Sequence, residues 1–467
     1  MRNDLKSLIF ASVAMSCGDN GGREESSSNP VTTTNPSGVS LTSLSEGTPT
    51  TSGDGGTGGT GTGAGSVSAS ESQGTETTQA SQASAVSDDD GGLPKTDVGA
   101  QPDFGSMACG DGGGGGMGDP NFSYIWIANS AQNTISKIDT QTMVELARYL
   151  VRPDSLGNPS RTSVNLSGDV VTASRSGGFT KFHARLEDCV ESNGVPGIQT
   201  ATDANFLAWD QEECRAWHTP MAYQSQRPAA WTQGTLNPAT CEYNNQKVWT
   251  AGAKDPIEGP YSESIEILLV NGDNGAVEAT IPVPGVDSGF YGIYGAAVDQ
   301  QGNFWGSQLG QGFLINVDIN TLQLRKWPMV AAGYGMTVDS KGYVWTCSSN
   351  ASRFDPMTET WQTATVGGSG GCMEDGKGTL YMSGGAGDIV AVDTETLTVK
   401  TTYAVPQYVH GISIDFYGYV WGVSMNTQAY RVNLTDSSVM TFEGLVGAYT
   451  YSDMTGFALS NVGSPQG

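Results

Sequence analysis

The segment Tyr334-Gly-Met-Thr-Val-Asp339-Ser-Lys-Gly342-Tyr-Val-Trp345 contains the pattern that decides the fold of this chain. β-Branched and aromatic residues flank a short turn, in which Asp339 and Gly342 supply the turn chemistry. The segment therefore predicts two strands joined by a tight turn, with a large aromatic residue, Trp345, in the second strand.

The same pattern occurs three more times, and its aspartates are spaced 36 to 40 residues apart. The further copies are Tyr294-Gly-Ala-Ala-Val-Asp299-Gln-Gln-Gly302-Asn-Phe-Trp305, Gly370-Gly-Cys-Met-Glu-Asp375-Gly-Lys-Gly378-Thr-Leu-Tyr381 and His410-Gly-Ile-Ser-Ile-Asp415-Phe-Tyr-Gly418-Tyr-Val-Trp421. Core packing explains the recurring tryptophans. Repetition at this period indicates an array of similar supersecondary units.

A second motif, Asp-x-x-Thr, follows the first three copies. It occurs at 318–321, 355–358 and 393–396, and also near the start of the domain at 139–142. An aspartate side chain can accept hydrogen bonds from the backbone of such a turn. Each repeat therefore contains two hairpins, and a four-stranded unit with a period near 40 is typical of a propeller blade.

We predict an all-β fold, a seven-bladed β-propeller over residues 119–462. The four aligned repeats supply four blades. Residues 121–158 supply three strands of a first blade, and Ser160–Val171 open a second. Residues 225–287 form a third blade around Lys247-Val-Trp-Thr250.

The first blade lacks its leading strand, and the C-terminus offers a replacement. Thr455–Leu459 resembles His410–Ile414, so we predict that it closes the ring. Closure removes the open edges that a propeller would otherwise expose. An insertion is expected at about 186–225. Because the 186–245 stretch is irregular, six or eight blades remain open alternatives.

The N-terminal 17 residues predict export. Arg2 and Lys6 flank the start of the segment, and the apolar run Leu8–Met15 is too short to span a bilayer. This arrangement is typical of a signal peptide. Ala14-Met-Ser-Cys17 resembles a bacterial lipobox, which predicts lipidation of Cys17 and an anchor in the cell envelope, at the outer membrane or the surface. Ordinary secretion is the alternative.

Residues 18–118 consist almost entirely of small, polar and acidic residues. Such a segment cannot bury enough apolar surface to fold, so we predict a disordered linker. The 467-residue chain carries 22 Lys+Arg against 48 Asp+Glu, a formal net charge of −26. This balance excludes the basic footprint of a nucleic-acid-binding protein and argues against docking on anionic lipid.

Six cysteines follow Cys17, and an even number in an exported chain predicts disulfides. Locality favours Cys189 with Cys214 and Cys347 with Cys372. Cys109 and Cys241 are then left to pair, although sequence alone does not choose among the pairings. The chain has no CxxC pair and three histidines, which argues against a zinc site.

The Gly-x-x-x-Asp-x-x-Gly-x-x-Trp repeats, with Pro159-Ser-Arg161 and Ser174–Lys181, resemble the streptogramin (virginiamycin B) lyase family of seven-bladed propellers. NHL-type propellers are similar more loosely. The resemblance covers residues 121–460. It implies a propeller and, as an activity, the opening of a cyclic depsipeptide by elimination. That family uses a histidine base beside a Glu-x-His pair, with magnesium to stabilise the developing anion.

One histidine matches this catalytic pattern by position. His410 begins its repeat, but Tyr408 stands where the pattern has glutamate. His183 and His218 lie in or beside the insertion. The resemblance therefore leaves His410 as the candidate base of a lyase-like enzyme.

The start of each inner strand is predicted to line the mouth of the central channel. Matching the repeats places six residues there: Arg161, Arg227, Tyr294, Tyr334, His410 and Asp453. Convergent polar groups in a concave site predict a ligand site. Arginines with aromatic residues suit an anionic or carbohydrate-like ligand. The alternative is that these side chains bond to neighbouring blades and plug the channel.

The insertion contains Glu191-Ser-Asn193-Gly-Val195-Pro196-Gly-Ile, which resembles a calcium-binding loop. Glu191 and Asn193 would be its oxygen ligands. Val195 and Pro196 replace an acid and the turn glycine, so a degraded loop is the alternative interpretation. The sequence thus suggests calcium in this loop, and the family resemblance implies magnesium as a second metal.

Our leading hypothesis is a monomeric binding or scaffold propeller on a lipid anchor, with a small molecule, a glycan or a protein as its ligand. The alternative hypothesis is a lyase-like enzyme that acts on a cyclic ester, with His410 as its base. The missing Glu-x-His pair is the sequence feature that separates the two hypotheses.

Overall fold

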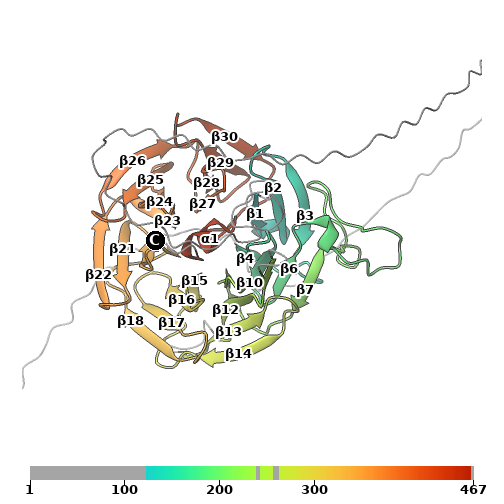
Figure 1. The fold of residues 1–467 in the computed structure, drawn as a ribbon, viewed down its shortest axis with the longest axis horizontal. Helices are drawn as coiled ribbons and strands as arrows, with labels where there is room; N and C mark the ends of the chain where they lie inside the picture. The colour runs from blue at the N-terminus through green and yellow to red at the C-terminus, as the bar shows by residue number, and fades with distance from the viewer. Residues whose placement is uncertain (1–122, 238–241, 256–261, 464–467) are drawn as a thin grey trace, which may run out of the picture. The chain divides into compact units, whose positions relative to one another are not determined.

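The computed structural model describes residues 123–237, 242–255 and 262–463. Seven small antiparallel sheets stand in a ring, with their inner strands around its axis (Figure 1). The predicted seven-bladed β-propeller is confirmed. The signal peptide, Cys17, the linker and the Cys109–Cys241 pair lie outside the described residues.

Blades 1 to 3 are the less regular half of the ring. Blade 1 contains β1 (Tyr124–Asn129), β2 (Thr134–Asp139) and β3 (Glu145–Leu150), with the 3-10 turn η2 (Ser130–Gln132); blade 2 contains β4 (Pro159–Val164), β5 (Val170–Ser174), β6 (Phe179–Phe182) and β7 (Arg215–Thr219), with η3 (Leu186–Asp188) after β6; blade 3 contains β8 (Ser225–Gln226), β9 (Ala230–Trp231), β12 (Lys247–Ala253), β13 (Ile265–Asn271) and β14 (Val277–Pro282). The inner strand of blade 3 is broken into β8 and β9, which both pair with β12.

Blades 4 to 7 each contain four consecutive strands. They are β15 (Ile293–Val298), β16 (Phe304–Gln308), β17 (Phe313–Val317) and β18 (Leu324–Pro328); β19 (Gly335–Val338), β20 (Val344–Cys347), β21 (Asn350–Asp355) and β22 (Thr360–Thr365); β23 (Gly368–Glu374), β24 (Thr379–Gly384), β25 (Asp388–Asp393) and β26 (Val399–Ala404); and β27 (Gly411–Ile414), β28 (Val420–Val423), β29 (Gln428–Val432) and β30 (Val439–Glu443). The first strand of each blade lies innermost and the fourth lies at the rim (Figure 1).

The repeated aspartate bonds both to its turn and to the tryptophan. Asp339 Oδ1 accepts hydrogen bonds from the backbone N–H groups of Lys341 and Tyr343, both at 2.9 Å. Its Oδ2 accepts the indole N–H of Trp345 at 2.7 Å. The same aspartate–indole bond occurs at Asp299 and Trp305 and at Asp415 and Trp421. One carboxylate thus joins the turn to the buried aromatic residue, which is why both recur at a fixed spacing.

The Asp-x-x-Thr motif forms the outer turn as predicted. Asp318 Oδ1 accepts the backbone N–H of Asn320 at 3.0 Å, and both the N–H and the hydroxyl of Thr321, at 2.8 and 2.9 Å. Asp393 bonds to Thr396 in the same way. These bonds satisfy turn backbone groups that face solvent at the edge of the blade.

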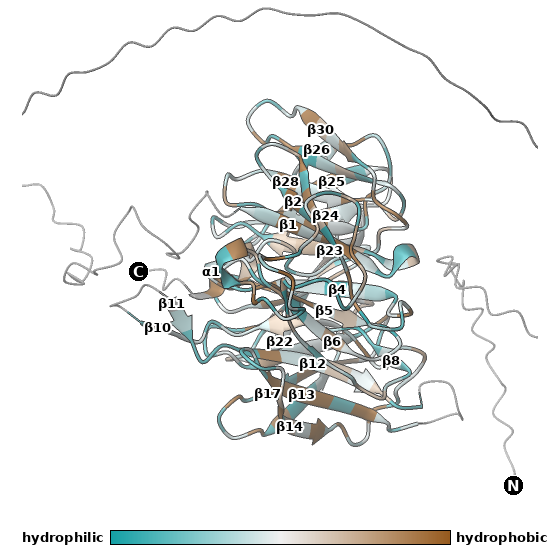
Figure 2. Ribbon diagram, turned by 90° about the vertical axis from the view of Figure 1, so that its right-hand side faces the viewer, coloured by the Kyte–Doolittle hydropathy of each residue, from teal (hydrophilic) through white to brown (hydrophobic). Residues whose placement is uncertain are grey.

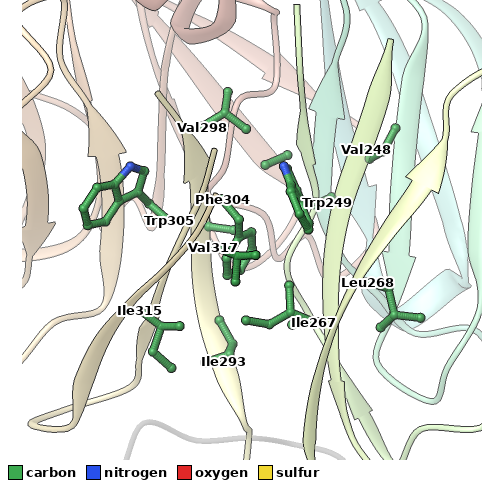
Figure 3. Close-up of a cluster of buried hydrophobic side chains, with 14 of the residues drawn as sticks. Val248, Trp249, Ile267, Leu268, Ile293, Val298, Phe304, Trp305, Ile315 and Val317 are labelled. Atoms are coloured by element: carbon green, nitrogen blue, oxygen red, sulfur yellow. The ribbon is translucent and has the colours of Figure 1, made fainter. Parts of the chain in front are cut away.

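Apolar side chains fill the space between neighbouring blades. Between blades 3 and 4, Trp249 and Ile267 pack against Phe304 and Val317 (Figure 3). All four are completely buried. Burying side chains of this size stabilises the fold by about 1.5–3 kcal/mol each, so the interfaces between blades are the core of the domain.

The C-terminal segment closes the ring, but the predicted strand at Thr455–Leu459 is wrong in its position. An isolated bridge joins Ala448 to Asn129 of β1, and the Trp126 N–H donates to the Met454 carbonyl at 2.9 Å. The segment that lies along β1 is therefore 448–454. The residues that follow this segment form a short helix.

This helix, α1 (Phe457–Gly463), lies at the centre of the ring (Figure 1). It stands on the same side of the ring as the hairpin of β10 (Thr235–Asn237) and β11 (Glu242–Asn244) (Figure 2). Gly456 has φ +83°, a conformation that glycine adopts without strain and that turns the chain out of the extended path. The Asp453 carboxylate then accepts the N–H groups of Gly456 and Leu459, both at 2.9 Å.

The insertion runs from residue 183 to residue 214, between β6 and β7, and so ends earlier than expected. Two predicted disulfides are confirmed. Cys189–Cys214 closes the insertion, and Cys347–Cys372 joins β20 of blade 5 to β23 of blade 6. Such bonds indicate a periplasmic or extracellular location. Among the described residues, no helix has the length and apolar character that crossing a membrane requires.

Candidate functional site

Three of the predicted site residues come together at one end of the channel. Tyr294 lies at the start of β15, and Tyr334 and His410 immediately precede β19 and β27. The Tyr294 hydroxyl donates to the Tyr334 hydroxyl at 2.7 Å. His410 Nε2 lies 2.6 Å from the same Tyr334 hydroxyl. Side chains from three different blades therefore share one hydrogen-bond network.

The C-terminal segment completes this network. The Tyr449 hydroxyl lies 2.6 Å from that of Tyr294 and also bonds to that of Tyr334. On the other side, Tyr408 bonds through its hydroxyl to His410 Nδ1 at 2.9 Å. Tyrosine hydroxyls thus occupy both ring nitrogens of His410. We call the set Tyr294, Tyr334, His410 and Tyr449 the hydroxyl cluster.

Burial determines the protonation state of His410. The side chain is 3% exposed, and its desolvation, reinforced by the charges of Arg161 and Arg175, lowers its pKa to about 3. The imidazole is therefore neutral at physiological pH. The pKa of Tyr334 is raised by burial and by the neighbouring tyrosines, so its phenol also stays neutral.

Three arginines surround the hydroxyl cluster and stack on its aromatic rings. Arg161 lies over Tyr451 and within 4.9 Å of the Tyr294 ring centroid. Arg175 lies 4.3 Å from the centroid of Tyr449. The third arginine, Arg227, lies 4.4 Å from the ring centroid of Tyr291 and 5.1 Å from that of Tyr294. Cations over aromatic faces gain cation–π stabilisation.

Strand pairing explains how Arg227 reaches this position. In blade 3, Trp249 pairs with Ala230, three residues after Arg227. In blade 4, the equivalent Trp305 pairs with the residue three positions after Tyr294. Arg227 is therefore the blade 3 counterpart of Tyr294, and it occupies this position although the inner strand is broken.

Arg161 stands where the regular repeats have glycine. Each of the four aligned repeats carries glycine as its second residue, because little room is left there. A Cβ on Gly335 would approach Gly371 Cα to 2.7 Å, and one on Gly411 would approach the Thr450 carbonyl oxygen to 2.1 Å. In blade 2 this position instead holds the long, positively charged side chain of Arg161, which is 1% exposed.

Asp453 does not join the other five predicted residues. Its carboxylate caps α1, and its backbone carbonyl accepts the N–H of Val164 at the far end of β4 from Arg161. The sequence comparison aligned the closing segment about six residues too late. Tyr449 and Tyr451, which lie at the mouth, were therefore missed, as were Tyr291 and Arg175.

The α1 end of the channel is mostly apolar. A cavity of about 40 Å³ lies between α1 and the inner strands, enough for a few water molecules. Its lining includes Trp231, Met336, Leu459 and Val462, and Asp453 at its edge. Burial raises the pKa of Asp453 to about 6, against the lowering effect of the backbone N–H groups that it accepts.

The loop that resembles a calcium site is closed by the protein's own groups. Glu191 accepts the N–H of Gly194, and Asn193 accepts the N–H of Val195. The carboxylate of Glu213 accepts three further backbone N–H groups of the loop. These bonds hold the loop in the way that a cation and its ligands would otherwise do.

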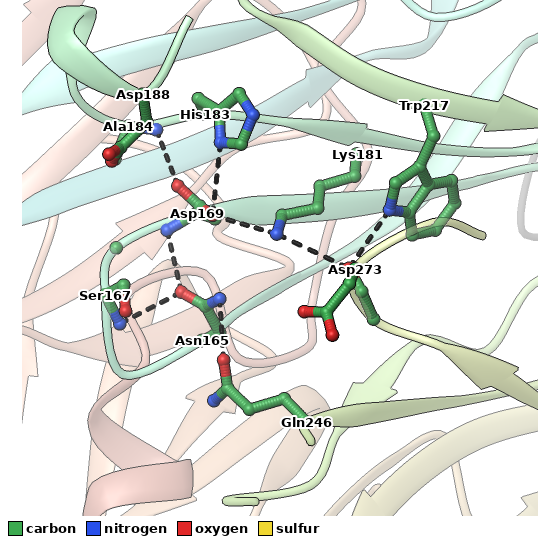
Figure 4. A network of polar contacts seen from close by, with 12 residues as sticks. Asn165, Ser167, Asp169, Lys181, His183, Ala184, Asp188, Trp217, Gln246 and Asp273 are labelled. Atoms are coloured by element: carbon green, nitrogen blue, oxygen red, sulfur yellow. Dashed lines mark hydrogen bonds and ion pairs between the residues drawn. The ribbon is translucent and has the colours of Figure 1, made fainter. Parts of the chain in front are cut away.

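A second acidic group lies where the insertion leaves β6. Asp169, His183 and Asp188 offer ligand atoms close together, but Lys181 Nζ already lies 3.0 Å from Asp169 (Figure 4). Asp188 pairs with Arg185 at 2.8 Å. These cations compensate the carboxylates, and the network connects β4, β6 and the insertion.

Comparisons with known proteins match the fold alone. No protein-family model matches the chain, and no curated protein does. Among solved structures, virginiamycin B lyase from Staphylococcus aureus is similar at 12% identity and TM-score 0.42, covering 61% of this chain and 84% of that one. Apo AztD from Citrobacter koseri has 13% identity and TM-score 0.44, with 70% and 96% covered. The β-propeller domain of Cps50 (Swd1) from Myceliophteria thermophila has 11% identity and TM-score 0.43, with 61% and 86% covered.

Proposed function

We propose that this protein is an exported binding module that captures its ligand at the mouth of the propeller channel. The observation that carries the proposal is the convergence of Tyr294, Tyr334 and His410 from three blades on one hydrogen-bond network. Blade formation does not require this network, because the equivalent residue of blade 6 is Gly370. Polar groups that converge at a channel mouth are typical of ligand sites.

The geometry favours binding over elimination. A general base needs a pKa near the working pH and a free nitrogen that reaches the substrate. The pKa of His410 is about 3, and tyrosine hydroxyls engage both of its nitrogens. In the proposed function, His410 orients Tyr334 and does not abstract a proton.

Ligand-observed NMR on the full chain tests the site with a library of sugars, peptidoglycan fragments and small organic acids. Tyr334→Phe removes one hydroxyl and keeps the ring, so we expect the affinity of a mouth ligand to fall about fivefold or more. Tyr403→Phe on the outer strand β26 is the matched control and should bind as wild type. Equal affinity for both variants would place the site elsewhere and contradict the proposal.

We further propose that Cys17 carries the lipid that holds this module in the cell envelope. The lipobox-like sequence before it supports this assignment. Metabolic labelling with a radioactive fatty acid should mark the wild-type chain and not Cys17→Ser. A labelled Cys17→Ser protein would contradict the proposed anchor.

A further inference from the structure

Two buried arginines at the channel mouth pair with none of the acids that the structure describes. Arg161 is 1% exposed and Arg227 is 6% exposed. Over the part of the chain that the structure describes, no ion pair includes either residue. Buried charges in proteins are normally paired, because desolvation of a lone charge is unfavourable. Arg161 and Arg227 depart from this rule in a chain of net charge −26, in which acidic residues are abundant.

Each of these two arginines also keeps a buried N–H group that finds no acceptor among the described residues. Arg161 donates through Nη2 to the Tyr294 carbonyl at 2.6 Å, but its Nη1 has no partner. The Nε of Arg227 is likewise unpartnered. An unsatisfied donor on a buried cation is expensive to maintain, so these atoms indicate where an acceptor from outside the chain would be stabilised.

The electrostatics of Arg161 agree with this geometry. Its burial lowers its pKa to about 9, and the nearby positive charge of Arg227 acts in the same direction. Two like charges held together without an acid create a positive potential that a bound anion would neutralise.

The surroundings supply further donors and a route to solvent. Tyr334, Tyr449 and Arg175 are half-buried, so the hydroxyl cluster reaches the surface. Tyr291 packs on Tyr294 with ring centroids 5.5 Å apart, and beside it Phe290 is 71% exposed. A ligand that enters here meets hydroxyl donors, guanidinium groups and an aromatic wall.

We propose that the channel mouth binds the oxyanion group of a small solute, a carboxylate, sulfate or phosphate, through Arg161, Arg227 and the hydroxyls of Tyr334 and Tyr449. This inference rests on the proposed function and names the ligand chemistry of that site. Arginine suits this role because its planar N–H groups match the geometry of a two-oxygen anion. The hydroxyls that now bond to one another would rotate to donate to the anion.

Isothermal titration of the full chain in a chloride buffer tests the inference. The probes are inorganic phosphate, inorganic sulfate and galacturonate, with neutral galactose as the uncharged match for galacturonate. We expect at least one oxyanion to bind and galactose to bind at least tenfold more weakly than galacturonate. The three oxyanions distinguish phosphate, sulfate and carboxylate sources of the same chemistry.

Two variants and a control locate the binding. Arg227→Gln removes a charge from the mouth and should weaken oxyanion binding at least tenfold. Tyr449→Phe removes one hydroxyl with little change of shape and should also weaken oxyanion binding. Arg325→Gln removes the same charge from the exposed outer strand β18 and should leave it unchanged. If Arg227→Gln does not fold, the oxyanion affinity of Tyr449→Phe still tests whether binding occurs at the mouth.

The outcomes separate this inference from the proposed function. If an oxyanion binds, and if Tyr449→Phe weakens this binding while Arg325→Gln preserves it, the result supports both the oxyanion inference and the proposed function. If a neutral sugar binds at the mouth with an affinity equal to that of galacturonate, the oxyanion inference is overturned and the proposed function stands. If no probe or library ligand responds to the mouth variants, both are overturned.

Discussion

The two ends of the propeller channel differ in chemistry although the same inner strands line both. At the mouth, tyrosine and histidine side chains from several blades share one hydrogen-bond network, and arginines stack on their rings. At the other end, α1 covers a mostly apolar cavity, and one carboxylate, Asp453, caps the helix. The repeat thus builds the wall of the channel, while residues that depart from the repeat decide what each end does.

The C-terminal segment connects these two ends. It lies along β1 from Ala448 to Met454, places Tyr449 and Tyr451 at the mouth, and then forms α1 at the opposite end. Substitutions near this segment should therefore damage one end or both, depending on where they act.

The largest effect is expected from Gly411→Ala, which should damage the mouth without changing any polar side chain. The new Cβ would approach the Thr450 carbonyl oxygen to 2.1 Å, so the closing segment must move. We expect a loss of about 3 kcal/mol or more in the free energy of unfolding, measured by urea denaturation. Gly385→Ala is the control, since its nearest neighbour would lie at 3.9 Å. Equal stability of the two variants would show that the segment is not tightly held.

Leu459→Ala tests the α1 end alone. Leu459 is 3% exposed and lines the cavity, so its truncation should cost about 2–3 kcal/mol. Ligand affinity at the mouth should stay unchanged, which sharpens the separation of the two ends. Val399→Ala on the exposed rim is the matched aliphatic control and should be neutral. A stable Leu459→Ala protein would mean that α1 contributes little to the fold.

His410 should make the mouth end sensitive to acid. Its pKa is near 3 in the folded protein and about 6.5 when unfolded. The contribution of neutral His410 to the free energy of unfolding is therefore complete above pH 6.5. It is lost as the pH falls toward 3, with a loss of about 2 kcal/mol at pH 5. His410→Phe should flatten that decline in thermal unfolding experiments. Imidazole NMR that shows protonation with a midpoint near pH 6 would refute the assignment.

Asp453 should make the stability of the fold depend on pH in the opposite direction, through the α1 end. Its pKa is raised to about 6 in the folded protein, so the fold binds this proton more tightly than the unfolded chain does. The stabilisation from this raised pKa is complete below about pH 4 and is lost as the pH rises through 6, a total loss of about 3 kcal/mol. Asp453→Asn should remove this slope from a series of denaturation curves. An unchanged slope would indicate that another acid is responsible.

Sequence periodicity predicted the propeller because blade formation depends on local, repeated contacts. In blades 4, 5 and 7 the aspartate of the inner turn bonds within six residues, to its own turn and to the following tryptophan. The outer Asp-x-x-Thr turn is equally local. Contacts of this kind recur at a fixed spacing and can be found by aligning the chain with itself.

The closing segment was predicted in the wrong position because it makes no local turn of this kind. Its partners are in β1, more than 300 residues earlier, and its backbone bonds to β1 are irregular. A pattern match to His410–Ile414 therefore chose Thr455–Leu459, whereas Gly456 and the Asp453 cap send those residues into α1.

The sequence by itself predicted seven blades, their turns and two local disulfides, because each depends on residues close along the chain. Six or eight blades and other cysteine pairings stayed open until the tertiary structure decided between them. It also marked Arg161, Tyr294, Tyr334 and His410 as residues at the starts of inner strands. Only the tertiary structure decided that these side chains share one network, that Tyr449 joins them, and that Asp453 lies at the opposite end. The reason is physical: ring closure brings together side chains from distant repeats, and no local spacing encodes which of them meet.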